Sequence, residues 1–363
     1  MSRWHGARPM LSARGMIEAK VKIALLGIKK AMTASSAALP EFAKACEVLG
    51  LDPDDLTIPG SAQGDGEAKR FMFWQPGSIV WMLMQELSVI RASILASDCG
   101  TGKTVTALGL VVAAAGAKET SNKGLDNPTP YRPTLIITPT QSIDVWYADM
   151  QKFYPDCLSM YQFYDTSHTV DSSRATFLID PSAEELTAFL DKLDLADPKT
   201  VWTMVISSYK TRFYRTIDTA YENDTVRQYA TKDDNSDDIV GGRVYSSKIR
   251  LRFERVICDK AYYLRNPRTK VSEAIRQTNR VYSHFLTATP ILNHAKDFRG
   301  LLSLIWNPQW QLSGLTSSTV KTVNDDDLEI EYINMVPDAF EDAEWNREFL
   351  RVLPHYTWIL DPQ

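Results

Sequence analysis

The chain has 363 residues, of which 44% are hydrophobic and 23% are charged, a composition typical of a globular protein with one large core or two smaller ones. The formal net charge of -5 argues against a uniformly basic nucleic-acid-binding protein, so any contact with nucleic acid must come from local basic strips. The four cysteines are scattered without a CxxC pair, which indicates neither a disulfide framework nor a zinc site. No apolar run approaches the roughly 20 residues that cross a bilayer, so we expect a soluble protein of a reducing compartment with no membrane partner.

Residues 1–69 are expected to form a helical extension and a linker. The first residues carry three arginines and no acid before Glu18, which favours a disordered basic tail and leaves an organelle transit peptide as the alternative. An amphipathic helix is expected next, because apolar residues recur at helical spacing with lysines between them: Ile17, Val21, Ala24, Ile28 and Met32. The stretch from Asp52 to Glu67 is rich in Pro, Gly and Asp and predicts a linker, so the main domain should begin near Arg70.

Short β-rich runs then alternate with helical ones, which predicts a parallel sheet with helices on both faces. A helix is expected from Lys103 towards Ala115, and another around Trp146. Two polar stretches, Glu119–Pro133 and Glu222–Gly242, are expected to be surface insertions. The expected strands are the runs 92–96, 134–138, 202–207, 255–258 and 284–289.

A phosphate-binding loop is the firmest inference from the residues themselves. Its members, Gly100, Thr101, Gly102, Lys103 and Thr104, stand between an apolar strand and a helix. Glycines let backbone N–H groups surround phosphate oxygens, the lysine reaches the β and γ phosphates, and the threonine hydroxyl is a ligand for Mg²⁺. The first glycine of the usual pattern is replaced by Ser97. The segment therefore predicts nucleotide binding without identifying the class of P-loop protein.

Five further strings accompany the loop in chain order. They are residues 71–86 with Trp74 and Gln75, residues 134–155 with Thr140 and Trp146, residues 204–213 with Ser207, Ser208 and Lys210, residues 255–270 with Asp259, and residues 284–305 with Thr287 and Thr289. Their types and their order resemble the motifs of Swi/Snf-type ATPases of helicase superfamily two. The resemblance covers about two thirds of the chain, from Trp74 to Ile305.

The resemblance implies a RecA-like P-loop NTPase lobe at residues 70–310, with a parallel central sheet flanked by helices, that uses ATP and Mg²⁺. Gln75 would recognise adenine with its amide, and Asp259 would hold the metal together with Thr104. Contacts to a DNA backbone would come from Thr140, Ser207 and Ser208, while Thr287 and Thr289 would couple the nucleotide to the nucleic acid. A chromatin-remodelling role and a nuclear location are implied in the same way. The basic run from Lys248 to Arg255 fits either a nucleic-acid contact or a solvated face.

Two departures from the family pattern bear on catalysis. Lys260 occupies the position of the glutamate that orients the attacking water, and Tyr262 that of the histidine. A cationic lysine cannot serve as that carboxylate. Residues 311–363 are too few to form a second lobe. In the family that the motifs resemble, the second lobe supplies arginine fingers, which raise the rate of hydrolysis by about 10³- to 10⁵-fold.

We therefore expect a hydrolysis-deficient ATP-binding lobe of a DNA-dependent ATPase, with a second lobe in trans or a protein partner possible. The alternative is a degenerate nucleotide-binding scaffold or switch that acts through protein partners without catalysis. A small-molecule kinase is the least favoured interpretation, because it would need a substrate lid and would not need the string 284–293.

Overall fold

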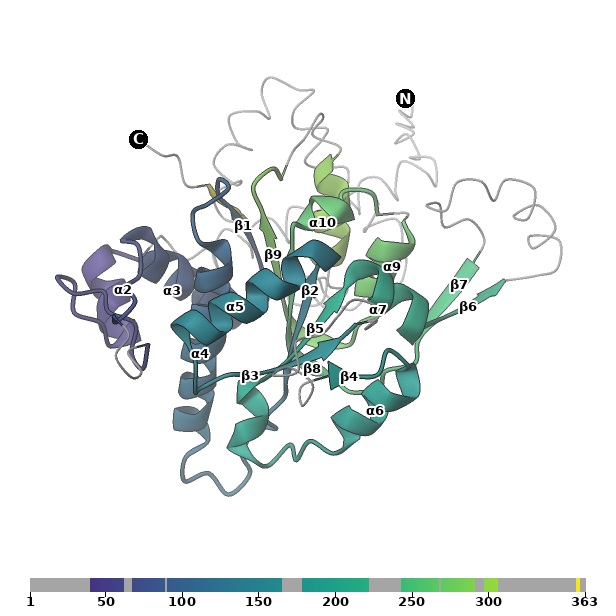
Figure 1. Ribbon diagram of the computed structural model, residues 1–363, viewed down its shortest axis with the longest axis horizontal. Helices are drawn as coiled ribbons and strands as arrows, with labels where there is room; N and C mark the ends of the chain where they lie inside the picture. Colours follow the sequence, from purple (N-terminus) through teal and green to yellow (C-terminus); the bar gives the residue numbers. More distant parts are fainter. Residues whose placement is uncertain are drawn as a thin grey trace, which may run out of the picture.

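The computed structural model describes residues 40–61, 67–88, 90–164, 178–221, 243–267, 269–290, 297–305 and 357–359. Among them, eight strands form one sheet in which every neighbouring pair is parallel, in the order β10-β1-β9-β8-β2-β5-β3-β4 (Figure 1). The strands are β1 (Ala92–Ala96), β2 (Thr134–Thr138), β3 (Ser159–Phe163), β4 (Leu178–Ile179), β5 (Thr203–Ser208), β8 (Phe253–Asp259), β9 (Arg280–Thr287) and β10 (Thr357–Ile359). A separate antiparallel pair joins β6 (Ile217–Tyr221) to β7 (Arg243–Ser247).

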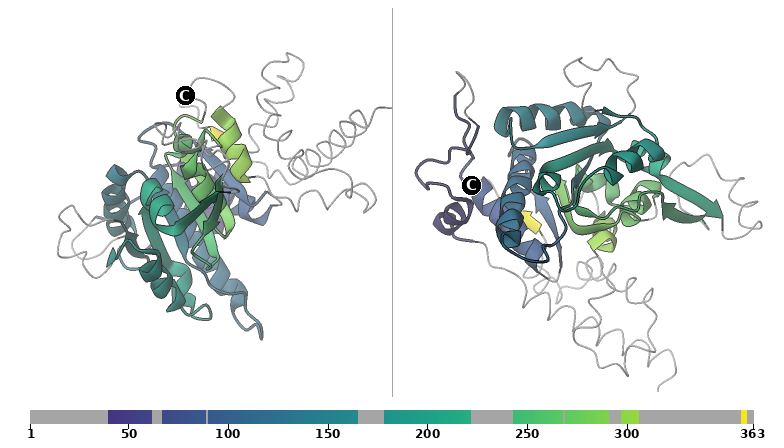
Figure 2. Two further views of the ribbon diagram at one scale, coloured as in Figure 1. Left: turned by 90° about the vertical axis from the view of Figure 1, so that its right-hand side faces the viewer. Right: turned by 90° about the horizontal axis from the view of Figure 1, so that it is seen from below.

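Helices cover both faces of this sheet, as the two further views in Figure 2 show. The α-helices are α2 (Phe42–Leu49), α3 (Trp74–Leu87), α4 (Lys103–Asn122), α5 (Ile143–Phe153), α6 (Ala183–Asp191), α7 (Tyr209–Thr216), α9 (Lys270–Arg276) and α10 (Phe298–Ile305). Short 3-10 turns are η1 (Thr140–Ser142), η3 (Pro198–Trp202) and η4 (Ala261–Leu264). The predicted fold class, a parallel sheet flanked by helices, is confirmed.

Successive residues of a buried strand serve two different cores. In β2, Leu135 and Ile137 join the cluster that packs under α6, α7, α9 and α10, whereas Ile136 joins the cluster under α2, α3, α4 and α5. This follows from the strand geometry, because neighbouring side chains point to opposite faces of the sheet. A strand buried on both faces needs a continuous apolar run, and "TLIIT" provides one.

Three segments have contacts or secondary structure that their local sequence did not predict. The segment that was expected to be a linker packs against the main domain: Ile58 is 1% exposed and lies in the same core cluster as α3 and α4. Helix α4 continues to Asn122, so the first part of the stretch 119–133 is helical, where Glu119 accepts a hydrogen bond from the Trp202 indole at 2.5 Å. Residues 357–359, expected to belong to a C-terminal tail, form β10 at one edge of the main sheet. The amphipathic helix expected near residues 17–32 and the acidic stretch 222–242 lie outside the described residues.

A buried polar network fastens α3 to the sheet near the amino ends of its strands. Glu86 of α3 accepts hydrogen bonds from Arg255 of β8 through both oxygens, at 2.8 and 3.3 Å, and is also 2.9 Å from Nε2 of His284 of β9. Ser93 and Thr134 complete the network, with Ser93 Oγ 2.7 Å from His284 Nδ1 and Arg255 donating to Thr134 at 3.2 Å. Arg255 is therefore a core residue. Although it belongs to the basic run Lys248–Arg255, its side chain is not available to contact nucleic acid.

Candidate nucleotide-binding site

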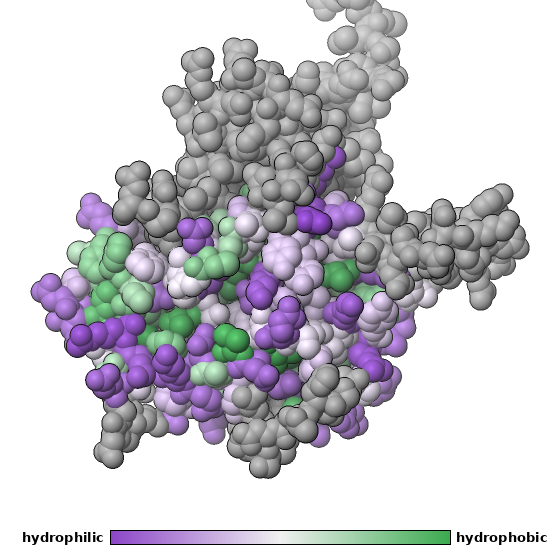
Figure 3. Space-filling model, turned by 45° about the horizontal axis from the view of Figure 1, so that its top comes forward, coloured by the Kyte–Doolittle hydropathy of each residue, from purple (hydrophilic) through white to green (hydrophobic). Residues whose placement is uncertain are grey.

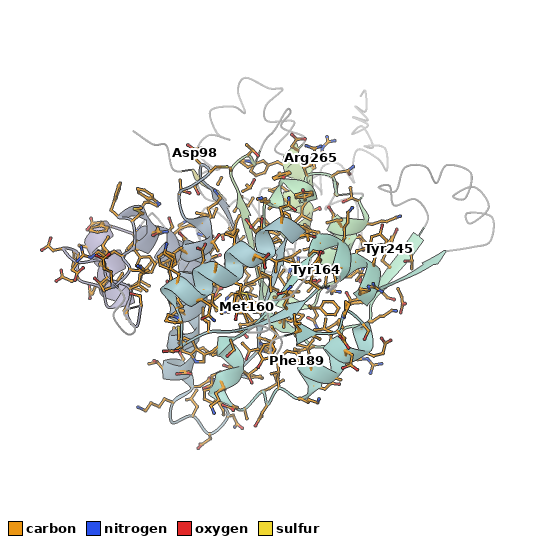
Figure 4. The ribbon with its side chains drawn as sticks, in the orientation of Figure 1. Asp98, Met160, Tyr164, Phe189, Tyr245 and Arg265 are labelled. Carbon is orange, nitrogen blue, oxygen red and sulfur yellow. The ribbon has the colours of Figure 1, made fainter. Side chains whose placement is uncertain are left out.

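The residues that were predicted to form a nucleotide site gather where neighbouring parallel strands end. Ala96 of β1 is paired with Thr287 of β9, and Asp259 of β8 is paired with Leu286, which also belongs to β9. The phosphate loop, the acidic residue and the threonine-containing string thus meet at one edge of the sheet. Figure 4 labels Asp98 and Arg265, which mark this upper edge. Ligands of open α/β sheets bind in this position, beyond the carboxyl ends of the strands.

The phosphate loop has a backbone conformation that only glycine adopts easily. Gly100 and Gly102 have φ angles of +84° and +78°, in the left-handed region. Helix α4 begins directly afterwards at Lys103, and no side chain caps its first turn. The N–H groups of this first turn and the positive end of the helix dipole are therefore the groups that would bind an anion here.

The Lys103 ammonium holds the loop closed from the inside. Its Nζ donates to the backbone oxygens of Ser97 and Asp98, each at 2.7 Å. Burial lowers the pKa of Lys103, while the negative potential of Cys99, Asp259 and Asp98 acts in the opposite direction. An anion in the loop would offset this desolvation. Thr104 follows on the first turn of α4 and is half-buried, and its role as a hydroxyl ligand for a metal stays a prediction.

Two residues at the start of α3 support the loop from outside. The Trp74 indole donates to the oxygen of Thr101 at 3.1 Å, and the Gln75 Nε2 donates to the oxygen of Gly102 at 3.1 Å. The Gln75 Oε1 accepts from the N–H of Met72 at 2.8 Å, and the side chain is only 3% exposed. Both ends of this amide are therefore engaged by the protein itself. Adenine recognition by Gln75 stays a prediction, and it would require one of these bonds to be exchanged.

The carboxylate of Asp259 is held by three donors. Its Oδ2 accepts from Thr138 Oγ1 at 2.9 Å and from the Trp146 indole at 3.0 Å, while its Oδ1 accepts from the N–H of Lys260 at 2.8 Å. A carboxylate offers about four lone-pair positions. The one that remains free belongs to Oδ1, so a cation would meet this oxygen. Carboxylate and hydroxyl oxygens suit Mg²⁺, which binds through one or two protein oxygens and keeps several waters.

Lys260 has a strained backbone in the middle of this edge. Its φ of +50° places a non-glycine residue in the left-handed region, which costs about 1–2 kcal/mol. The hydrogen bond from its N–H to Asp259 and its position at the N-terminus of η4 hold it there. Strain of this kind is concentrated at functional sites. The position is structurally special, yet the side chain on it is an ammonium and not a carboxylate.

Three stacked tyrosines continue from this point. The ring centroids of Tyr209 and Tyr263 are 5.5 Å apart, and those of Tyr263 and Tyr262 are 4.6 Å apart. The Tyr209 hydroxyl donates to the backbone oxygen of Asp259 at 2.7 Å, and burial raises the pKa of this phenol. Tyr262, at the position of the family's histidine, is therefore part of an aromatic stack.

The residues expected to contact nucleic acid have different environments. Thr140 is exposed at the start of η1. Ser208 is 3% exposed and its hydroxyl accepts from the N–H of Thr211, so that it caps α7, and the Ser207 side chain is fully buried. Both serine hydroxyls satisfy local groups at a strand end, and their contact with a phosphate backbone stays a prediction.

The two residues expected to couple nucleotide and nucleic acid differ in exposure and contacts, and their coupling role stays a prediction. The Thr287 hydroxyl accepts from the N–H of Thr289 at 3.1 Å, which is a local turn bond. The contact with the phosphate loop is made by the Thr287 backbone oxygen, which accepts from the N–H of Ser97 at 3.2 Å. Thr289 itself is exposed. The string therefore meets the loop through its main chain.

Sequence reasoning missed two residues that hold the site together, Trp146 and Tyr209. Trp146 was expected only as part of the helix after Thr140, and it is fully buried with its N–H on Asp259. A buried indole N–H needs an acceptor, so a tryptophan on a buried helix face indicates a polar contact, but the sequence does not identify Asp259, which lies 113 residues further along the chain. The hydroxyl of Tyr209 gives no comparable signal, because the bond depends on how β5 and β8 are placed.

Comparisons with known proteins fit this geometry. The profile of one protein family, described as the SNF2-related domain, matches residues 74–320. The chain is 23% identical over 227 residues to the DNA repair protein RAD5 of Debaryomyces hansenii, covering 61% of this chain and 16% of that protein. It is 23% identical over 256 residues to the DNA repair protein RAD5 of Saccharomyces cerevisiae, covering 65% of this chain and 19% of that protein. The match thus spans about a fifth of the length of these relatives.

Among solved structures, the chain is similar to the Sulfolobus solfataricus SWI2/SNF2 ATPase core in complex with dsDNA, with a TM-score of 0.44 and 17% identity over 79% of this chain and 43% of that one. Within the described residues, none of the helices is long and apolar enough to span a bilayer.

Proposed function

Because the chain belongs to the SNF2-related domain family of helicase-like ATPases, we propose that it is an ATP-binding lobe whose own hydrolysis of ATP is slow. The observation that carries the proposal is the loop between β1 and α4, with its two left-handed glycines, its inward lysine and Asp259 two strands away. When bound, the nucleotide and Mg²⁺ would supply the phosphate charge and the Lewis acid. The chain's own residues bind, orient and shield them.

Each residue has a definite part in this proposal. Lys103 exchanges its two carbonyl partners for phosphate oxygens, and the first N–H groups of α4 donate to the same anion. Thr104 and the Oδ1 lone pair of Asp259 that no described residue occupies would hold the metal. Trp146 and Thr138 keep the carboxylate in one orientation by occupying Oδ2.

Slow hydrolysis is proposed from Lys260. No carboxylate stands at the position next to Asp259, so no base there can orient the attacking water. The Lys260 ammonium adds positive charge next to Asp259. This charge would attract the phosphates of bound ATP but would not help to hydrolyse it. A role in DNA repair with DNA binding extends the proposal by analogy with the RAD5 relatives, whereas a chromatin-remodelling role and a nuclear location stay expectations from the family resemblance. Thr140 is the exposed candidate for a phosphate contact.

Calorimetry with folded protein tests the first step. Wild type should bind ATP in the presence of Mg²⁺, and Lys103→Ala should weaken binding by about 10- to 100-fold, as expected for the loss of hydrogen bonds from a charged donor worth about 1.5–3 kcal/mol. Thr101→Ser keeps both the loop hydroxyl and the backbone groups and serves as the control. Absence of any binding heat with folded wild type would contradict the proposal.

Hydrolysis assays test the second step. Turnover should stay near background with and without duplex DNA, and Lys260→Glu should raise it whereas Lys260→Ala should not. Strong DNA-stimulated turnover by wild type would overturn the inactive part of the proposal and leave nucleotide binding intact. Equal turnover of the two Lys260 variants would show that another missing group limits the reaction.

A second candidate function is a nucleotide-dependent switch that acts on protein partners, and Lys260 favours it, because a switch needs binding and no catalytic base. The two functions differ in whether ATP and DNA change each other's binding affinity, an effect that must be reciprocal. A motor lobe should bind duplex DNA with an affinity that ATP changes. A switch should be stabilised by ATP without any effect of ATP on DNA affinity.

A further inference from the structure

A second site lies on the side of the molecule that is formed by α2 and α4. A groove with a volume of about 640 Å³ is bounded by α2, the segment 51–59, α3 and α4, and most of its lining is apolar. Side chains that define its walls are Val48, Leu51, Ile58, Phe71, Val112 and Trp202. In Figure 3, hydrophobic and hydrophilic surface lie side by side over the left part of the molecule, where Figure 1 places α2 and α3.

One face of α4 carries small side chains along the groove. The groove is lined by residues 109, 112, 113, 116, 117 and 120, which recur at intervals of three and four and so form a single stripe along the helix. Four of these six residues are small: Gly109, Ala113, Gly116 and Ala117. A Cβ on Gly116 would meet nothing within 4 Å, so the groove is open at this point. Small residues allow another helix to approach closely.

The closed end of the groove contains an unpaired hydroxyl. A Cβ on Gly109 would lie 2.6 Å from Ile79 and 3.0 Å from the Tyr154 hydroxyl, so these two side chains fill the space there. Tyr154 is 3% exposed, and its hydroxyl has no hydrogen-bond partner among the described residues. Burial raises its pKa, so it is a neutral donor. An unsatisfied buried hydroxyl is unfavourable, and a polar group of an occupant would satisfy it.

The segment 40–61 contributes lining residues on one side of the groove and is acidic, and it is called the acidic rim below. Residues 40–61 carry five carboxylates against one lysine, Lys44, and all five belong to exposed residues: Glu41, Glu47, Asp52, Asp54 and Asp55. Two of them have cationic neighbours already, since Glu47 pairs with Lys44 and Asp55 with Arg70. The others keep the field negative. A partner for this surface should therefore be apolar on one face and basic on the other.

The chain contains a segment of this kind directly before α2. Residues 17–32 have an apolar stripe at helical spacing, with Lys20, Lys22, Lys29 and Lys30 and one acid, Glu18. They lie outside the described residues. We propose that this segment docks in the groove as an amphipathic helix, with its apolar face on the α4 stripe and its lysines towards the acidic rim.

Length permits this arrangement. Sixteen helical residues span about 24 Å, and the α4 stripe from Gly109 to Thr120 spans about 16 Å at 1.5 Å per residue. The ten-residue interval from Met32 to Phe42 reaches up to about 33 Å when extended, which is sufficient to return the chain to the groove. The proposal does not depend on nucleotide binding.

Hydrogen exchange on the full chain tests the docking. Backbone amides of residues 17–32 should exchange at least about tenfold more slowly than unstructured-peptide rates. Gly116→Leu should abolish this protection, because the new side chain fills the open part of the groove without strain in α4. Gln151→Leu adds the same side chain at an exposed position of α5 and should leave the protection unchanged. Circular dichroism of both variants should be that of wild type.

Unprotected amides in wild type, or equal protection in wild type and Gly116→Leu, would overturn the proposal. A second variant, Ile28→Asp, alters the segment instead of the groove and should also abolish protection. Light scattering over a range of protein concentrations shows whether the occupant is instead a second copy of the chain. If protection appears only together with a dimer, the groove is filled by a second copy and the intramolecular docking is wrong.

Discussion

The buried network around Glu86 should make the stability of this protein depend on acid in a defined pH window. Burial by itself raises the pKa of this carboxyl, but Arg255 and His284 outweigh it and lower the pKa from 4.5 to about 2. Such a depressed value means that the ionised carboxylate is favoured in the folded state. Its contribution is fully present above pH 4.5 and is lost as the pH falls towards about 2.

The magnitude follows from the difference in pKa between the two states. Each unit is worth about 1.36 kcal/mol, so a lowering from 4.5 to about 2 corresponds to about 3 kcal/mol of unfolding free energy. The side chain is 7% exposed, so little of this is lost to solvent screening. The value is a large fraction of the 5–15 kcal/mol that typical proteins have.

Urea unfolding at a series of pH values measures this contribution. Between pH 5 and 3, wild type should lose about 2 kcal/mol of unfolding free energy more than Glu86→Gln, whose amide does not titrate. Glu47→Gln removes an exposed carboxylate and should keep the wild-type slope. Parallel curves for wild type and Glu86→Gln would refute the reasoning.

The same network predicts a non-additive result at pH 7. Glu86→Gln leaves the Arg255 cation buried without a counter-charge and should cost about 3–5 kcal/mol. Replacing both partners, as Glu86→Leu with Arg255→Met, should be clearly less destabilising than the single change. This double variant keeps the test informative if the single variant does not fold.

Three further predictions concern the site and its frame. Trp146→Phe should raise the Mg²⁺ concentration needed for nucleotide binding several-fold while leaving Mg²⁺-free binding unchanged, because only the orientation of Asp259 depends on the indole; equal effects with and without Mg²⁺ would indicate a general loss of structure. Gly102→Ala should weaken nucleotide binding at least about tenfold in calorimetry, since φ is +78° and the added Cβ would lie 2.5 Å from Gln75 Nε2. Gly300→Ala should destabilise the fold by about 3 kcal/mol or more in urea unfolding, because its Cβ would overlap backbone oxygens of a neighbouring turn; a loss below about 1 kcal/mol would contradict this packing.

Local signals in the sequence were sufficient for the sheet and for the phosphate loop. Apolar runs such as "TLIIT" predicted buried parallel strands, and the glycines before Lys103 predicted a turn that closes around an anion. Both depend on residues adjacent in the chain, whose conformational preferences act wherever the segment is placed. The departure at Lys260 could be read in the same way.

Tertiary structure alone decided which groups the site residues touch. The hydroxyl of Thr138 and the indole of Trp146 meet Asp259 across more than 100 residues of chain, and the Gln75 amide is engaged by Gly102. Composition suggested that residues 52–67 were a linker, yet Ile58 packs in the core because α2 and α3 bring an apolar surface to it. Residue type determines what a side chain can bond to. Which partner it finds depends on the relative placement of strands and helices, and that is set by burial over the whole domain.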